Sequence, residues 1–396
     1  MLVKYIYILI LIIDICILIL QTQNLSISYS EASILYGDIS FLQVLTNVSF
    51  TIFGKNDFSL RFVMILFHVL TVVLMYEVSK KYISTQRDRV WFILLFVLLP
   101  GIVSSAVILN SAGMVILGLV LYVYLYKKIS QIYMNGLLLF YSIIDIGFSY
   151  LFLGLITYYV TKGDKKQSLY MLGLYLLNSY LYGFDASGAP TGHFLDTIGI
   201  YSAIFTPIVF VYLFYALYKN YFLCREEMLW HISSVALIVS LILSLRQRVP
   251  VEHFAPYLIV ALPIAAKSFI HSYRVRLKIY RKKYKIAFIV SFIFLVTNAL
   301  IVFFNKELYL ILEKPKHNFA YKMHVAKELS SKLKELKIEC IDTNYKMQER
   351  LYFYDIKKCS QYALTEQKLD SSQYNVTVSY RNKLLYKGYV TNINNR

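Results

Sequence analysis

The residues best suited to chemistry in this chain are acids, arginines and histidines that stand between long apolar runs. Two acids, Glu31 and Asp38, follow the first apolar run, and an arginine pair, Arg246 and Arg248, follows a later one. An acid at a membrane–water boundary can act as a general base or hold a metal ion. Paired arginines can hold a phosphate. These residue types suit chemistry on a phosphate or sugar that is linked to a lipid.

The apolar runs that must position these residues are typical of a polytopic membrane protein. Hydrophobic residues make up 58% of the 396-residue chain, and charged residues only 16%. Apolar runs of about 18 residues or more can cross a bilayer as helices. About eleven crossings are expected, at 2–20, 58–78, 91–109, 113–126, a short helix pair within 129–160 that turns at 145–147, 168–182, 198–218, 230–245, 254–270 and 286–304.

The distribution of positive charge predicts how these spans are oriented. The net charge of +18 comes largely from short basic loops between apolar runs, at 80–89, 127–128, 162–166, 219–225 and 273–285. Such loops remain in the cytoplasm. The N-terminus is therefore expected in the cytoplasm, and the charge gives no reason to expect a nucleic-acid partner. Loops 21–57, 184–196 and 246–253 are expected on the outer face, together with the C-terminal tail.

Acids and cationic donors thus gather on the face opposite the basic loops. Taken alone, the pattern is explained better by the ordinary polarity of loops than by a site. The residues concerned are Glu31, Asp38, Asp57, Arg61, Asp145, Asp185, His193, Asp196, Arg246, Arg248, Glu252 and His253.

The tail at 305–396 is polar and is expected to form a small α/β domain. A helical pattern covers 320–336, and alternating patterns predict strands at 337–341, 350–354, 374–380 and 384–390. Cys340 and Cys359 lie in this tail. They can form a disulfide if the tail is outside the cytoplasm, and the sequence leaves the pairing open.

An ordered set of motifs near the N-terminus resembles a known family. An acidic motif, Ser30-Glu31-Ala32, is followed by the hydrophobic stretch 40–50, a Phe53-Gly54 turn, Phe58-Ser59-Leu60-Arg61, and a span that closes in Lys80-Lys81. This order resembles the C-type (GT-C) glycosyltransferases, in particular the protein O-mannosyltransferase and lipid A aminoarabinose transferase branch (glycosyltransferase family 39-like). The likeness extends to 112–128 and covers about the first 165 residues; beyond that it is one of topology.

The resemblance implies an all-α GT-C fold over 1–304, including the outward loop 21–57, with an outward α/β domain over 305–396. It also implies a polyprenyl-phosphate-linked sugar as donor. A carboxylate would act as general base on a glycan, lipid or protein acceptor, and arginines would neutralise the phosphate that leaves. In this chain Glu31 and Asp38 are the catalytic candidates, and the substrate-binding candidates are Arg61, Arg246, Arg248, His193, Glu252 and His253. A requirement for a divalent cation is left open.

Two departures from the family keep other functions open. The family usually has Asp where this chain has Ser30, and an acid where it has Asn110-Ser111-Ala112-Gly113. A non-catalytic accessory protein with the same fold is one alternative. A transporter or a polysaccharide polymerase is another, although no internal repeat stands out and the largest mid-chain outward loop is only 184–196. Frequent Ile, Lys and Tyr suggest an AT-rich bacterial genome, and hence a bacterial inner membrane.

Overall fold

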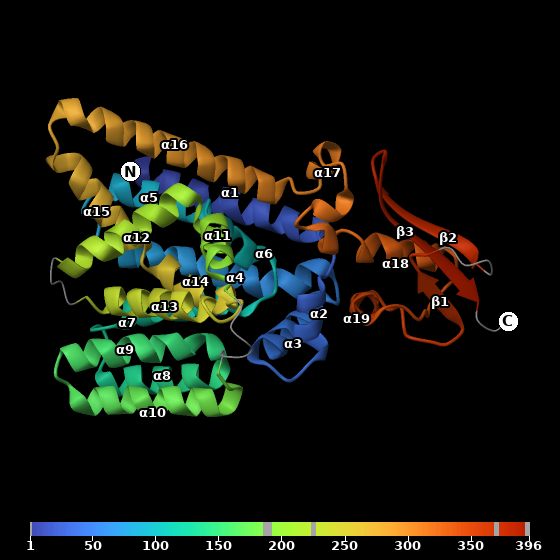
Figure 1. Ribbon diagram of the computed structural model, residues 1–396, viewed down its shortest axis with the longest axis horizontal. Helices are drawn as coiled ribbons and strands as arrows, with labels where there is room; N and C mark the ends of the chain where they lie inside the picture. Colours follow the sequence, from blue (N-terminus) through green and yellow to red (C-terminus); the bar gives the residue numbers. More distant parts are fainter. Residues whose placement is uncertain (1, 185–191, 223–226, 368–371, 393–396) are drawn as a thin grey trace. The chain divides into compact units, whose positions relative to one another are not determined.

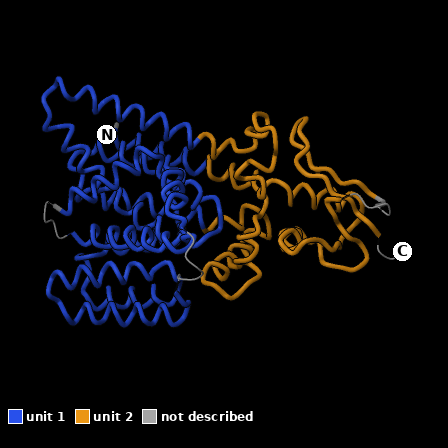
Figure 2. The backbone as a smooth tube through the Cα atoms, viewed as in Figure 1, with its two compact units in different colours: residues 1–16, 64–299 blue, residues 17–63, 300–396 orange. Residues whose placement is uncertain are grey.

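The computed structural model describes residues 2–184, 192–222, 227–367 and 372–392 (Figure 1). The chain forms two compact units, and each is discontinuous in sequence (Figure 2). Unit 1 comprises Met1–Cys16 and Met64–Ala299, and unit 2 comprises Ile17–Val63 and Leu300–Arg396. The expected division at 304/305 placed loop 21–57 with the membrane helices. In the structure that loop folds with the C-terminal tail.

Two long helices belong to both units, because each begins in one and ends in the other. They are α1 (Leu2–Asn24) and α4 (Asp57–Ser79). The rest of unit 1 is helical, which confirms the expected fold class. Its elements are α5 (Gln86–Val97), α6 (Pro100–Val107), α7 (Ser111–Leu125), α8 (Gln131–Ile144), the 3-10 helix η1 (Ile146–Phe148), α9 (Ser149–Thr161), α10 (Lys165–Tyr182), α11 (Phe194–Phe205), α12 (Pro207–Phe222), α13 (Met228–Ser244), α14 (Val251–Val260), α15 (Leu262–Val275) and α16 (Lys278–Phe303).

The expected helix pair within 129–160 is confirmed. Helices α8 and α9 flank η1, and α10 packs against both, so that the three lie side by side in Figure 1. Asp145 ends α8 and caps η1 by accepting a hydrogen bond from the Gly147 backbone at 2.7 Å. On its other side α9 packs closely against α13, where a Cβ on Gly154 would lie 2.6 Å from the Ile232 backbone. Glycine is required by that close approach.

Two expected spans are not single continuous helices, because each is broken near a proline. The run 91–109 divides into α5 and α6, which are bent by 61°, and the run 198–218 falls on α11 and α12, bent by 104°. Pro100 and Pro207 begin the second helix of each pair. Proline lacks a backbone N–H and disfavours helical conformation in the residue before it. Accordingly Leu99 is extended (ψ 127°) and Thr206 has φ 66°.

The chain is a multi-pass membrane protein. Within the described residues, four helices are long and apolar enough to cross a bilayer, Val3–Asn24, Asp57–Ser79, Val251–Val275 and Lys278–Phe303, and the two bent pairs raise this to six if each is one span. Most of the additional helices that the expected count of about eleven includes are shorter apolar ones, such as Ser111–Leu125 and Met228–Ser244. The expected span at 168–182 falls on α10, which belongs to neither group. Fifteen residues of helix rise only about 22 Å, which is less than a typical hydrocarbon core.

Unit 2 combines short helices with a small sheet, as expected for the tail. Its helices are α2 (Tyr29–Tyr36), α3 (Phe41–Phe53), α17 (Leu308–Ile311), α18 (Ala326–Glu335) and α19 (Tyr345–Phe353), with 3-10 helices η2 (Pro315–His317) and η3 (Tyr321–Met323). Strands β1 (Tyr362–Thr365), β2 (Ser372–Tyr380) and β3 (Lys383–Asn392) form an antiparallel sheet in the order β1-β3-β2.

Several predictions for the tail are corrected by this structure. The strands at 374–380 and 384–390 are confirmed as β2 and β3. The strand at 350–354 is wrong, because Asn344 caps a helix there by accepting from the Met347 backbone at 2.9 Å. The strand at 337–341 is reduced to an isolated bridge between Cys340 and Lys357. The helix at 320–336 begins only at Ala326, and β1 was not expected.

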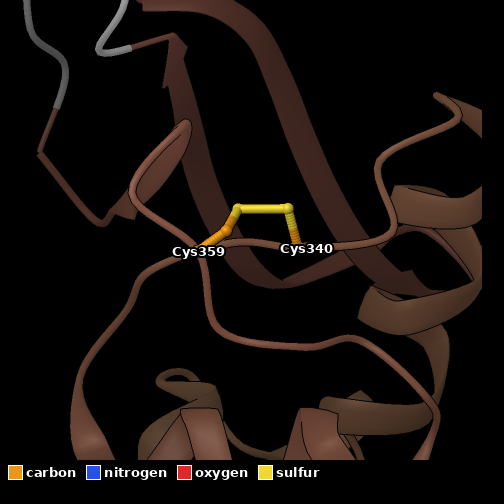
Figure 3. Close-up of a disulfide and its surroundings, with 2 residues drawn as sticks. All are labelled: Cys340 and Cys359. Atoms are coloured by element: carbon orange, nitrogen blue, oxygen red, sulfur yellow. A yellow bond between two sulfur atoms is a disulfide. The ribbon is translucent and has the colours of Figure 1, made fainter.

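A disulfide joins Cys340 to Cys359 in unit 2, which settles a pairing that the sequence left open (Figure 3). The two Cα atoms are 5.5 Å apart, which is an ordinary separation for a disulfide. Beneath this link, α18 and α19 pack through Leu329, Leu333 and Leu351, all of which are fully buried. At this size the core is small, so a covalent link is a useful addition to it.

Candidate functional site

Glu31 lies in the first turn of α2, where it closes a capping box. The Ser28 backbone N–H donates to Oε2 of Glu31 at 2.8 Å, and the Glu31 N–H donates to Oγ of Ser28 at 3.2 Å. Such a reciprocal pair fixes the first turn of a helix. The Glu31 side chain is fully buried. The local sequence therefore places this acid at the start of a helix, and the tertiary structure buries its side chain.

Arg61 of α4 is the partner of Glu31. Its Nε donates to Oε1 at 2.9 Å and its Nη2 donates to Oε2 at 2.9 Å, so the ion pair is bidentate, and both side chains are fully buried. The other guanidinium hydrogens go to backbone carbonyls of Thr22, Leu25 and Ser26. All five donors of Arg61 are thus used inside the protein. This pair fastens α2, α4 and the end of α1 to one another.

Asp57, one helical turn before Arg61, links α4 to the tail. Its Oδ1 accepts from the Tyr354 hydroxyl at 2.6 Å, and its Oδ2 lies 2.7 Å from Nζ of Lys327. The same hydroxyl accepts from the Ile27 backbone at 3.1 Å. Burial, and then the charge of Asp57, raises the pKa of Tyr354, so that this phenol stays a donor. Neither Tyr354 nor Lys327 carries a sequence signal that would have singled it out.

Asp38, the second catalytic candidate, is placed differently from Glu31. It lies in the turn between α2 and α3 and its side chain is exposed. The next helix, α3, starts at its own capping box, in which Ser40 and Gln43 bond reciprocally. Asp38 therefore belongs to a short connection that is held at both ends and open to solvent between them.

The remaining site candidates lie in unit 1, where they gather at three helix ends. The backbone N–H of His193, which caps α11, donates to the carbonyl of Ser244 at the end of α13 at 2.8 Å. Nδ1 of His193 lies 3.2 Å from Oδ2 of Asp196. Helices α13 and α11 both pack against α14, whose first turn contains Glu252.

The charged side chains of this helix-end cluster are largely open to solvent. Arg246 and Arg248 follow α13 directly and are exposed, and Glu252, in the first turn of α14, is exposed as well. His253 is partly buried. That these residues share one site stays a prediction. Asp185, also expected on this face, lies outside the described residues.

Unit 1 also contains an apolar pocket of about 450 Å³. Its walls come from α5, α12, α15 and α16, and include Trp91, Phe92, Phe269 and Phe288. Charged lining residues come from the helix ends, where Arg274 of α15 pairs with Asp88 of α5. A pocket of this size and apolar character can hold part of a hydrocarbon chain.

A buried contact between two ionisable side chains inside the membrane helices was not among the site candidates. Nε2 of His68 in α4 lies 2.6 Å from Oδ2 of Asp14 in α1, and both residues are buried. Ionisable groups inside a membrane are expected to pair with one another. The sequence marks both residues as intramembrane charges, but 54 residues separate them, so only packing shows that they are partners. Among the described residues no group of three or more His, Cys, Asp or Glu could hold a metal ion.

Comparison with solved structures finds the same architecture in ArnT from Cupriavidus metallidurans. Its apo crystal structure aligns with a TM-score of 0.55 over 97% of both chains at 12% identity. The crystal structure of ArnT bound to undecaprenyl phosphate aligns with a TM-score of 0.56 over 97% of both chains at 10% identity. No protein-family model matches the sequence, and neither does any curated protein. At this identity the likeness is one of fold, and the chain therefore has the GT-C fold of ArnT.

Proposed function

We propose that this protein is a membrane glycosyltransferase that moves a sugar from a polyprenyl-phosphate donor to an envelope acceptor. The observation that carries the proposal is the likeness of fold over 97% of both chains to ArnT, one structure of which holds undecaprenyl phosphate. The motif resemblance around Glu31 and Arg61 supports it independently, because it rests on the residues rather than on the fold. The acceptor is a glycan, a lipid or a protein.

The helix-end cluster is the proposed site for the donor phosphate. Arg246 and Arg248 follow α13 directly, and both side chains are exposed. Arginine suits this role because its planar guanidinium can bond two phosphate oxygens at once. His193, Glu252 and His253 are proposed to line the same site and orient the sugar.

The two candidate acids are proposed to act in different ways. A general base must come within hydrogen-bonding distance of the acceptor hydroxyl, and Asp38 is exposed. Glu31 is fully buried and holds Arg61 through two bonds of 2.9 Å. We therefore assign Asp38 as the base to be tested first. Glu31 is proposed to orient the outward segment with Arg61, and it would act as base only after that pair opens.

The reaction is proposed to take place on the extracytoplasmic face. The basic loops predict an outward tail, and unit 2 contains the Cys340–Cys359 disulfide. Disulfides persist in oxidising compartments and are rare in the cytoplasm. The N-terminus would then be cytoplasmic and the membrane a bacterial inner membrane.

A second function, a non-catalytic protein of the same fold, is favoured by one specific observation. Where the family usually has Asp this chain has Ser30, whose Oγ lies 3.1 Å from Oγ of Ser28. The neighbouring Glu31 is occupied by Arg61 and Ser28. Such a protein would bind a lipid-linked sugar or phosphate without transferring it, as an accessory to envelope glycan synthesis.

Binding of undecaprenyl phosphate by the full-length protein in nanodiscs tests the donor site. Since a hydrogen bond to a charged group contributes about 1.5–3 kcal/mol, Arg246→Ala with Arg248→Ala should weaken binding at least about tenfold. The matched control is Lys282→Ala with Lys283→Ala, which removes two exposed charges from α16. If both double variants weaken binding equally, the loss reflects general positive charge and not a phosphate site. If the wild-type protein does not bind undecaprenyl phosphate, the donor assignment is overturned.

Transfer assays then separate the two functions. Purified protein receives polyprenyl-phosphate sugars and a membrane extract of acceptors. A transferase is expected to turn over, and Asp38→Asn should lower the rate about 100-fold or more if Asp38 is the general base. Binding of undecaprenyl phosphate without turnover would favour the accessory function. Turnover that survives Asp38→Asn but not Glu31→Gln would move the base to Glu31.

A further inference from the structure

Unit 2 contains a second pocket, of about 400 Å³, that none of the proposed site residues enters. It lies where α2 and α19 pack against each other. Helix α19 contributes Tyr345, Gln348, Glu349 and Tyr352, and Tyr36 comes from the end of α2. The spacing of the four α19 residues places them on one face of the helix. We call this the tyrosine pocket; Thr343 and Lys358 complete its lining.

The tyrosines of this pocket are exposed to solvent. Tyr345 is 68% exposed, Tyr352 49% and Tyr36 37%. The rings of Tyr36 and Tyr352 meet edge to face, with centroids 4.9 Å apart and planes at 72°. Clustered exposed aromatics mark a binding surface more often than scattered ones do. Tyrosine also suits a polar ligand, because it offers a flat ring face and a hydroxyl.

Two lining residues of the tyrosine pocket, Gln348 and Glu349, have buried polar atoms whose hydrogen-bonding capacity is unused. Both the amide oxygen and the amide nitrogen of Gln348, and Oε2 of Glu349, are buried without a hydrogen-bond partner. The Tyr345 hydroxyl interacts with the Glu349 carboxylate, which raises the pKa of Tyr345. Leaving a buried polar group unsatisfied is unfavourable. A ligand that supplies both donors and acceptors would remove that penalty.

The chemistry of the lining restricts the class of ligand. None of the described lining residues is aliphatic, and the apolar part of the lining comes from tyrosine rings. Among the described lining residues Lys358 is the one cation, and its Nζ lies 3.5 Å from Oδ1 of Asp342. The Glu349 carboxylate would repel an anion. Flat aromatic faces together with amide, hydroxyl and carboxylate groups fit a neutral polyhydroxylated ring. Its C–H groups pack on the negative face of an aromatic ring, and its hydroxyls both donate and accept.

We propose that the tyrosine pocket binds a saccharide, held between Tyr345 and Tyr352 with its hydroxyls on Gln348 and Glu349. This is a carbohydrate-binding site separate from the donor site. It rests on the geometry of unit 2 alone, so it stands whether or not the protein transfers a sugar. If the proposed transferase function holds, the pocket would retain the glycan to which the sugar is added.

Saturation-transfer NMR and calorimetry with maltotriose, cellotriose and triacetylchitotriose test this site on the full-length protein in nanodiscs. Wild-type protein is expected to bind at least one of the three trisaccharides. Tyr345→Ala and Tyr352→Ala should each weaken that binding about tenfold or more, while Tyr345→Phe, which keeps the ring, should weaken it less. The matched control is Tyr374→Ala, because Tyr374 of β2 is 44% exposed and lies outside the pocket.

Two results would overturn the inference. One is a wild-type protein that unfolds cooperatively yet binds none of the three trisaccharides. The other is saccharide binding that Tyr345→Ala and Tyr352→Ala leave unchanged. Undecaprenyl phosphate binding is measured on the same variants and should be unaffected. Loss of lipid binding with intact saccharide binding would instead count against the proposed function and leave the tyrosine pocket in place.

Discussion

The sequence predicts two groups of polar site residues, and they differ in how far their side chains are exposed to solvent. In unit 2, Glu31, Arg61 and Asp57 are buried and satisfy one another, the backbone or the tail. In unit 1, Arg246, Arg248 and Glu252 are exposed at helix ends. The first group is built as a structural centre, whereas the second is presented to solvent, where a ligand can compete for it.

The lesson of this comparison is that a motif residue and a ligand-contacting residue need not coincide. Glu31 carries the family resemblance, yet its carboxylate orients α2 through Ser28 and α4 through Arg61. An acid with this set of partners acts by holding α2 and α4 in position. Substitutions in the buried group should therefore appear as lost stability, and substitutions in the exposed group as lost binding.

The largest effect is expected for Arg61→Met. Removing one partner of a buried ion pair leaves the other charge unpaired and costs about 3–5 kcal/mol. The fully buried Glu31 would be left in that state. Thermal unfolding in nanodiscs measures the loss, and Arg61→Met with Glu31→Leu should recover part of it. Lys55→Met is the control, because Lys55 pairs with Asp355 at an exposed site and should cost less than about 1 kcal/mol. If Arg61→Met and Lys55→Met lose the same unfolding free energy, the buried pair stabilises no more than the exposed one, and the comparison fails.

A somewhat smaller effect is expected for Cys340→Ser. The disulfide closes a loop over a separation of 19 residues, for which the chain-entropy estimate is about 3 kcal/mol. Amide hydrogen exchange in α18 and α19 should therefore become faster, while unit 1 is unchanged. Cys16→Ser, which removes an exposed free cysteine, controls for the substitution itself. Slower exchange in the Cys340 variant, or no change, would contradict a stabilising role for the disulfide.

The next effect is a dependence of unit 2 on pH. His324 is buried, with Nδ1 2.8 Å from the Tyr309 hydroxyl, and burial, and then the charge of Lys306, lowers the pKa of His324 to about 3. A depressed histidine pKa gives stability that is complete above the unfolded pKa of about 6.5 and is lost as the pH falls towards 3. Unit 2 should lose about 2 kcal/mol between pH 8 and pH 5.

Hydrogen exchange in α18 as a function of pH measures this loss, with the intrinsic exchange rates divided out. In His324→Gln the stability of unit 2 should vary less between pH 8 and pH 5. A profile as steep as that of the wild-type protein would assign the acid sensitivity to other groups.

The smallest effect on stability is expected in the exposed group. Arg246→Ala, Arg248→Ala and Glu252→Gln should each change the unfolding free energy by no more than about 0.5 kcal/mol, as surface substitutions usually do. The same thermal unfolding assay measures this. A loss comparable with that of Arg61→Met would show that the helix-end cluster is structural as well, and the distinction between the two groups would fail.

Much of the fold follows from local patterns. The apolar runs placed α4, α7 and α13 within a few residues of their observed bounds, and the turn at 145–147 between two short helices is correct. The two proline breaks were missed because hydropathy continues across Leu99 and Thr206, although proline itself carries the signal. Residues 350–354 were assigned to a strand because a short alternating run has no helical signature beyond the Asn344 cap.

The sequence by itself determined that the chain is a membrane protein with a small polar tail, because hydropathy and charge act residue by residue. It also pointed to Glu31 and Arg61 as members of one motif. Only the tertiary structure decided that these two neutralise each other, that residues 17–63 fold with the tail, and that Asp57 reaches Tyr354 297 residues later. The reason is physical: burial and pairing depend on which distant segments pack together, and a local pattern cannot carry that information.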